Sequence, residues 1–249
     1  MNDPAAYGDA IATLYDQEFA PPALSPENLA LLVRLAENRT VLDIGAGTGR
    51  VAVALARAGC TVTAVDVSQR MTDVLNTKID GLDVEVVCAD ATKVSPPGQH
   101  LLAVCLFNTL FMVGDREAQR ALLANAAGAL HPDGRLLVEG FMPDPGRFGG
   151  DGSASRVRAV TAERVIVQFS LHDAAAQRIT GQDVVFDKTG ITLLPATLHY
   201  LWPEQLDELA RSVGMRLERR WADWCWDSPV DSHTRNVLSL YRKANDDGE

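Results

Sequence analysis

The residues best suited to chemistry lie in one short run, VLDIGAGTGR at 41–50, where Asp43 is followed by glycines at positions 45, 47 and 49. Glycine has no Cβ, so the backbone of this run can turn sharply and approach a ligand closely. An amphipathic helix pattern begins directly after it, and the first N–H groups of a helix are free to bind a polar or anionic group. The combination predicts a site for a nucleotide-type ligand.

The spacing of the glycines distinguishes between two kinds of ligand. A dinucleotide fingerprint has the form GxGxxG, but here the spacing is GxGxG, and Arg50 stands where the third glycine would fall. Asp43 also precedes the first glycine by two residues, where its charge would repel a pyrophosphate and attract the ammonium group of an amino acid. These features favour S-adenosylmethionine over NAD.

Polar residues follow the next three predicted strands as well. Asp66 comes about 20 residues after the glycine loop, the offset at which an acid binds ribose hydroxyls. Asp90 could accept a hydrogen bond from an adenine amino group while the backbone of Ala91 faces a ring nitrogen. Asn108 and Thr109 end the fourth strand, beside the position of methyl transfer. Because the carboxyl ends of parallel strands meet at one edge of the sheet, we expect these residues to share a site.

Strands and helices alternate through the first part of the chain, which indicates a doubly wound, Rossmann-like parallel sheet of the α/β class. A continuous apolar strand such as LLAVCLF is typical of burial on both faces. After the first strand and helix, the expected strands are 61–67, 84–90, 101–107 and 135–141, and the expected helices are 68–79 and 115–130, with a break at HPDG 131–134.

The pattern changes after a loop rich in proline and glycine at 142–153. Strands follow without intervening helices, which suggests an antiparallel sheet inserted into the α/β domain. The expected elements are strands at 163–172, 178–187 and 191–201, a helix at 203–214, and two closing strands at 215–224 and 235–243. We therefore expect three parts: an N-terminal helical lid segment (1–34), a cofactor-binding core (35–142 and 203–249), and an inserted antiparallel β lid (143–202) over the acceptor site.

Three segments resemble the class I S-adenosylmethionine-dependent methyltransferases. VLDIGAGTGR resembles motif I of that family, VDVSQRM its acidic motif after the second strand, and CADAT its adenine-binding segment. The resemblance implies a seven-stranded sheet, mostly parallel with an antiparallel last strand. FNTLFM at 107–112 and HYLWPEQLDELARSVGMRL are similar to a bacterial subgroup of small-molecule and natural-product methyltransferases that includes the cypemycin N-terminal methyltransferase.

The resemblance also implies roles for individual residues. Asp43 and the glycine loop would hold the methionine end of the cofactor, Asp66 the ribose and Asp90 the adenine amine, and Met71 would pack on the adenine. The full set expected to bind S-adenosylmethionine is Asp43, Gly45, Ala46, Gly47, Gly49, Arg50, Asp66, Val67, Met71, Asp90, Ala91, Asn108 and Thr109.

Methyl transfer from a sulfonium needs little covalent help from the protein, which mainly aligns the reactants and excludes water. A hydroxyl acceptor benefits from a general base, whereas an amine only has to be deprotonated. The catalytic candidates are His199, Glu139 and Tyr15. His199 could instead be a polar residue on an exposed sheet face, Glu139 could equally be a solvated acid, and Tyr15 could simply pack a helix on the domain edge. Tyr15 is chosen over Tyr7 because YD at 15–16 matches the family pattern, in which such a tyrosine can touch the methionine group.

Trp221, Trp224 and Trp226 form a cluster in a chain with few aromatic residues. They either fill the interface between sheet and helices or provide an aromatic wall for a flat or cationic acceptor. The sequence leaves both interpretations open.

The composition narrows the function further. A net charge of −10 without a basic stripe disfavours a nucleic-acid partner, and the longest apolar run is too short to span a membrane. Four cysteines without a CxxC pair predict neither a zinc site nor a disulfide framework. Because we see no leader sequence, we expect the protein in the cytoplasm. We expect a monomer or a homodimer. We expect methyl transfer to nitrogen or oxygen of a small molecule or short peptide in secondary metabolism. The alternatives are non-methylating S-adenosylmethionine chemistry, such as rearrangement or cyclisation, and NAD-dependent oxidoreduction.

Overall fold

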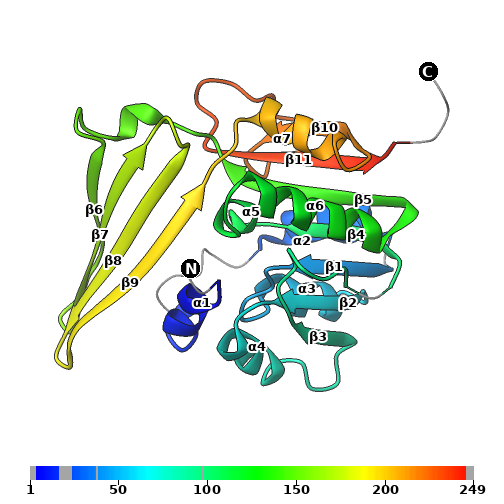
Figure 1. Cartoon of the computed structure of the whole chain (residues 1–249). Helices are drawn as coiled ribbons and strands as arrows, with labels where there is room; N and C mark the ends of the chain where they lie inside the picture. The colour runs from blue at the N-terminus through cyan, green and yellow to red at the C-terminus, as the bar shows by residue number, and fades with distance from the viewer. Residues whose placement is uncertain (1–3, 17–23, 38, 97, 245–249) are drawn as a thin grey trace.

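A seven-stranded sheet forms the centre of the computed structural model, which describes residues 4–16, 24–37, 39–96 and 98–244 (Figure 1). The strand order is β10-β11-β5-β4-β1-β2-β3. β11 is antiparallel to both of its neighbours, whereas the pairs from β5 through β4, β1 and β2 to β3 are parallel. This confirms the predicted fold class. The strands are β1 Thr40–Ile44, β2 Thr61–Asp66, β3 Val84–Cys88, β4 His100–Cys105, β5 Leu130–Phe141, β10 Met215–Ala222 and β11 Asn236–Lys243.

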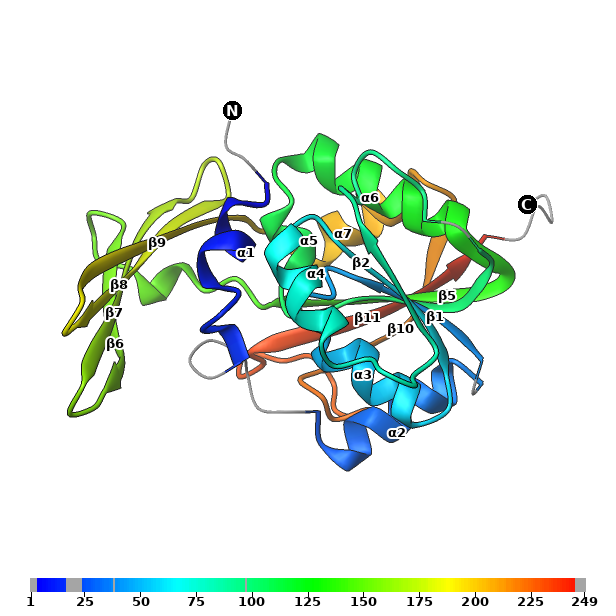
Figure 2. The same ribbon diagram turned by 90° about the horizontal axis from the view of Figure 1, so that it is seen from below.

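Helices cover both faces of this sheet, so each face buries its own apolar core. Figure 2 shows α6 and α7 on one side of the strands and α2 and α3 on the other. Ser25, Ser68 and Asp115 cap α2, α4 and α6, because each side chain accepts a hydrogen bond from a backbone N–H of the first turn. The helices are α2 Pro26–Leu35, α3 Arg50–Arg57, α4 Gln69–Asn76, α5 Thr109–Met112, α6 Arg116–Ala129 and α7 Pro203–Arg211.

The inserted strands form a second sheet of four antiparallel strands in the order β6-β7-β8-β9. A short 3₁₀ helix at Pro145–Arg147 leads into it. Both views show the helix α1 (Ala6–Ile11) between this second sheet and α4 (Figures 1 and 2). The strands are β6 Ser153–Val160, β7 Arg164–Asp173, β8 Arg178–Asp187 and β9 Gly190–His199.

Two of the expected elements differ in extent from the structure, and α5 was not expected at all. β5 begins at Leu130, because Leu130 already pairs with His100 of β4. The next pair joins Leu102 to Arg135, so the predicted HPDG turn lies within the strand as an irregularity of the pairing. The periodicity of residues 7–19 predicts a helix, but α1 ends at Ile11, turns follow over 12–14, and Tyr15 and Asp16 are π-helical. The remainder of that expectation, 17–19, lies outside the described residues.

The strand order places the site. β1 lies between β4 and β2. From β1 the chain adds β2 and β3 on one side of the sheet, and it then crosses over to add β4 and β5 on the other side of β1. In such a sheet, a crevice opens at the carboxyl ends of the central strands. Within the described part of the chain, no helix is both long and apolar enough to cross a bilayer.

Candidate functional site

The glycine loop connects β1 to α3 at the carboxyl end of the sheet. Gly45, Gly47 and Gly49 have φ angles of +73°, +56° and +89°, a left-handed conformation that strongly favours glycine. A side chain on Gly45 would overlap Thr109, so the loop lies directly against the start of α5. The backbone path therefore favours glycine at all three positions, and close packing also requires it at Gly45 and Gly49.

Asp66 holds the loop from the end of β2. Its Oδ2 accepts a hydrogen bond from the backbone N–H of Gly47 (2.8 Å), and its Oδ1 accepts one from Ser68 (2.9 Å). Burial raises the pKa of this carboxyl above its usual value, although the bonds from Ser68 and Gly47 act in the opposite direction. The two bonds fix the orientation of the carboxylate before any ligand arrives.

Asp43 is more deeply enclosed, with 3% of the residue exposed. Its Oδ2 has no hydrogen-bond partner among the described residues. Burial raises the pKa of Asp43 to about 7, and the nearby Asp66 adds to the effect. A buried carboxylate oxygen without a donor is costly unless a ligand supplies one.

A cavity of about 640 Å³ opens beside these acids. It fits S-adenosylmethionine, because the unpartnered Asp43 oxygen meets the need of an ammonium group and Asp66 lies beside the same loop. Gly49 and Asn108, which were expected to bind the cofactor, do not line it: Gly49 packs on Leu75, and Asn108 lines a neighbouring cavity. The predicted residues that do line it are Asp43, Gly45, Ala46, Gly47, Arg50, Asp66, Val67, Met71, Asp90, Ala91 and Thr109.

Asp90 resembles Asp66 and differs from Asp43 because both of its oxygens already have partners. Oδ1 accepts from the backbone N–H (2.9 Å) and hydroxyl (2.7 Å) of Thr92, and Oδ2 pairs with Lys93 at 2.9 Å. Burial raises its pKa, but the bonds from Thr92 and Lys93 outweigh burial, and the pKa is lowered overall. Asp90 is thus a stably ionised acceptor at the rim of the cavity.

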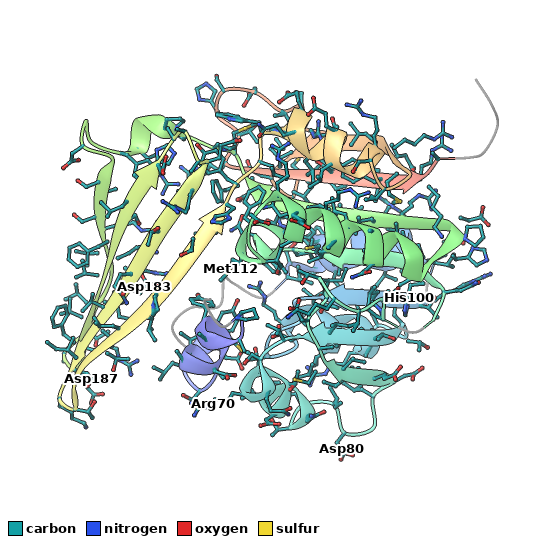
Figure 3. The ribbon with its side chains drawn as sticks, viewed as in Figure 1. Arg70, Asp80, His100, Met112, Asp183 and Asp187 are labelled. Carbon is teal, nitrogen blue, oxygen red and sulfur yellow. The ribbon has the colours of Figure 1, made fainter. Side chains whose placement is uncertain are left out.

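A second cavity of about 730 Å³ lies between the central sheet and the second sheet. The two cavities share a border made of Tyr7, Tyr15, Phe107, Met112 and Ala196. Figure 3 shows Met112 in this border region, between the two sheets, and Asp183 on β8. One cavity can therefore hold a cofactor while the other holds a second molecule next to it.

The three catalytic candidates lie in different places. Tyr15 lines both cavities, His199 lines the first, and Glu139 lines the second. Glu139 is only 5% exposed, and its two oxygens accept hydrogen bonds from Phe107 N (3.0 Å) and Trp224 Nε1 (3.1 Å). Of the three, Tyr15 is the one at the shared border.

The N-terminal segment is fastened over the first cavity at two points. Asp9 accepts a hydrogen bond from the hydroxyl of Ser68 (2.5 Å), the residue that caps α4. Asp16 accepts one from Thr48 in the glycine loop (2.5 Å) and pairs with Lys78. The segment thus contacts the two connections that follow β1 and β2, the strands that carry Asp43 and Asp66.

Sequence reasoning missed several residues of the second cavity. Tyr7 shares a segment with Tyr15 and could have been chosen with it. Arg158 and Asp183 gave no signal, because their pairing (2.8 Å) depends on how β6 and β8 align, and Arg158 lies at the irregularity between Val157 and Ala159. Of the tryptophans, Trp221 is buried in the core, whereas Trp224 lines the second cavity.

Comparisons with known proteins agree with this geometry. Residues 41–134 match the family model described as a methyltransferase domain. The chain is 30% identical to the cypemycin N-terminal methyltransferase of a Streptomyces species, over 87% of this chain and 89% of that protein. It is also 30% identical to the 27-O-demethylrifamycin SV methyltransferase of Amycolatopsis mediterranei, over 64% of this chain and 61% of that protein.

Among solved structures, the CcbJ methyltransferase of Streptomyces caelestis is similar over 98% of this chain and 100% of that chain. The TM-score is 0.89 and the identity is 31%. Family membership decides between the functional alternatives in favour of methyl transfer and makes S-adenosylmethionine the cofactor. The chain belongs to the class I S-adenosylmethionine-dependent methyltransferases.

Proposed function

We propose that this methyltransferase methylates a nitrogen atom of a small molecule or short peptide bound in the second cavity. The observation that carries the proposal is the shared border of the two cavities, formed by Tyr7, Tyr15, Phe107, Met112 and Ala196. An acceptor in the second cavity would meet the reactive end of a cofactor in the first across this border. Such alignment of two reactants, with water excluded, is the main contribution a protein makes to methyl transfer.

We assign the polar residues of the first cavity to parts of the cofactor. Asp43 would bind the ammonium group through its unpartnered oxygen, Asp66 the ribose hydroxyls, and Asp90 the adenine amine. Met71 would pack on the adenine ring, since it is 4% exposed and lines the cavity. When bound, the cofactor supplies an electrophilic methyl group, and the residues of this chain hold and shield it.

The chemistry of the border favours nitrogen over oxygen. Burial raises the pKa of both Tyr7 and Tyr15 above the ordinary value of a phenol, so both remain protonated at neutral pH. A protonated phenol is a poor base, and a hydroxyl acceptor benefits from a base, whereas a deprotonated amine does not need one. Tyr15 would then orient the acceptor by hydrogen bonding.

Oxygen is the second candidate for the methylated atom. The relative from Amycolatopsis mediterranei acts, by its name, on an oxygen. His199 lines the first cavity and would be the base for a hydroxyl acceptor.

The names of the relatives also support a role in natural-product biosynthesis. The net charge of −10 supports a partner other than nucleic acid. The four free cysteines support a cytoplasmic location, where thiols stay reduced. We keep the expectation of a monomer or homodimer, and we propose that the N-terminal segment and the second sheet act as lids over the two cavities.

A direct test compares matched acceptors. The full chain is incubated with methyl-labelled S-adenosylmethionine and with benzylamine or benzyl alcohol, two probes that differ only in an amine or a hydroxyl. A second pair is a short peptide whose N-terminal amine is either free or blocked by acetylation. Mass spectrometry should detect the gain of one methylene unit on amine probes. Methylation confined to the hydroxyl probes would refute the assignment to nitrogen.

A further inference from the structure

The turn after β4 has an unusual backbone. Phe107 and Asn108 have φ angles of +54° and +68°, so two consecutive residues other than glycine are left-handed. Each such residue costs of order 1 kcal/mol or more and persists only when its surroundings hold it in place. The turn matters because Phe107 lines both cavities and Asn108 lines the second.

Two groups on β5 hold this turn. Glu139 Oε2 accepts a hydrogen bond from Phe107 N at 3.0 Å, and Asn108 Oδ1 accepts one from Phe141 N at 2.8 Å. The other oxygen of Glu139 accepts from the indole Nε1 of Trp224 at 3.1 Å. Trp224 also stacks on the Phe107 ring, with 6.5 Å between centroids. The carboxylate therefore joins the strained turn to an aromatic wall of the second cavity.

We infer that Glu139 is a positioning residue for methyl transfer: together with Trp224 it holds the left-handed Phe107–Asn108 turn and so sets the wall against which the acceptor lies. The inference rests on the proposed function, because it assumes that the second cavity holds the acceptor. It replaces the expectation that Glu139 serves as a general base. Both oxygens of Glu139 already accept a hydrogen bond, so the carboxylate is held against Phe107 and Trp224.

The chemistry of the side chain gives a sharp test. A carboxylate can accept from two N–H groups, but an amide has one accepting oxygen and one donating NH₂ group. In Glu139→Gln, the NH₂ group must face either Phe107 N–H or Trp224 Nε1–H, and a buried donor then meets another donor. Trp224→Phe removes the indole donor, so glutamine in the double variant can turn its oxygen to Phe107 and avoid the conflict.

The experiment is a double-mutant cycle with the amine probe that the wild type methylates best. We expect Glu139→Gln to lower kcat/KM by roughly 10- to 100-fold, the scale of an unsatisfied buried donor, mainly through a higher KM for the acceptor. Affinity for S-adenosylhomocysteine should fall by a smaller factor than affinity for the acceptor, because Phe107 is the one residue of this arrangement that also lines the first cavity. The double variant should recover most of the loss. Glu139→Gln with Trp226→Phe is the matched control and should recover nothing, because Trp226 packs on Trp221 and Arg219 instead.

Two further measurements do not depend on turnover. The indole N–H resonance of Trp224 in ¹⁵N-resolved spectra should shift in Glu139→Gln. The Tm of thermal unfolding should be lower in that variant than in the wild type and should recover in the double variant. If no amine probe is methylated by the wild type, the proposed function fails, while these two measurements still test the hydrogen-bond arrangement. A double variant as impaired as Glu139→Gln in activity and in stability, or an indole resonance that does not move, would overturn the inference.

Discussion

Asp66→Ala should weaken the binding of S-adenosylhomocysteine by about 1.5–3 kcal/mol, or roughly 10- to 150-fold, the range for hydrogen bonds to a charged group. The magnitude follows from how the carboxylate is held. Backbone N–H groups of Gly47 and Ser68 fix its orientation at 2.8 and 2.9 Å, so a ligand spends no free energy on ordering it. Asp66 also lines the first cavity directly.

The assay is isothermal titration calorimetry on the full chain. Thermal unfolding without ligand is recorded in parallel, because Asp66→Ala also leaves two backbone N–H groups without their acceptor. Asp83→Ala is the matched control: this exposed carboxylate accepts a hydrogen bond from Thr61 at the opposite end of β2. Its removal should leave the affinity unchanged.

Two results would refute the reasoning. An unchanged dissociation constant for Asp66→Ala, with the protein folded, would remove this carboxylate from the cofactor site. An equal loss of affinity in Asp83→Ala would show that the effect comes from the strand as a whole and not from a contact with the ligand.

Four other predictions concern Asp43 and the glycine loop. Since burial raises the pKa of Asp43 to about 7 and an ammonium group favours its ionised form, affinity for S-adenosylhomocysteine should fall up to about tenfold for each pH unit below 7, and calorimetry of Asp43→Asn should give a flat profile. Because the pKa of Asp43 is higher in the folded state than in the unfolded state, the free energy of unfolding should fall as pH rises from about 4 to 7. Urea titrations at these two pH values would test this. Thr48→Val removes the hydroxyl that donates to Asp16 and should weaken cofactor binding by about 1 kcal/mol, whereas an unchanged calorimetric affinity would mean that this bond does not secure the N-terminal segment. Gly49→Ala should lower the free energy of unfolding by about 2–5 kcal/mol, because φ is +89° and its Cβ would overlap buried Leu75; a smaller loss in denaturant titration would mean that α3 shifts to relieve the overlap.

The cofactor half of the molecule could be predicted well from sequence because its signals are local. A glycine at a left-handed position, an acid at the end of a strand and a serine at a helix N-terminus each act through the backbone within a few residues. Asp43, Asp66 and Asp90 therefore came together at one edge, once alternating strands and helices had indicated a parallel sheet. The limits of this logic appear at Gly49, whose role is to pack on Leu75 and not to line the cavity.

The acceptor half depends on contacts between segments far apart in the chain. Glu139 is an ordinary acid at a strand end in the sequence, and only the tertiary structure gives it Phe107 and Trp224 as donors. The border between the cavities likewise joins the N-terminal segment, the turn after β4 and β9.

The sequence by itself thus determined the fold class, the methyl donor and the three acids that line the first cavity, because backbone conformation and strand ends are encoded locally. The tertiary structure alone decided which side chains meet where the two cavities join. Those contacts depend on the register between β5 and β11, on the registers of the pairs β6–β7, β7–β8 and β8–β9, and on the packing of α1. A local sequence pattern specifies none of these.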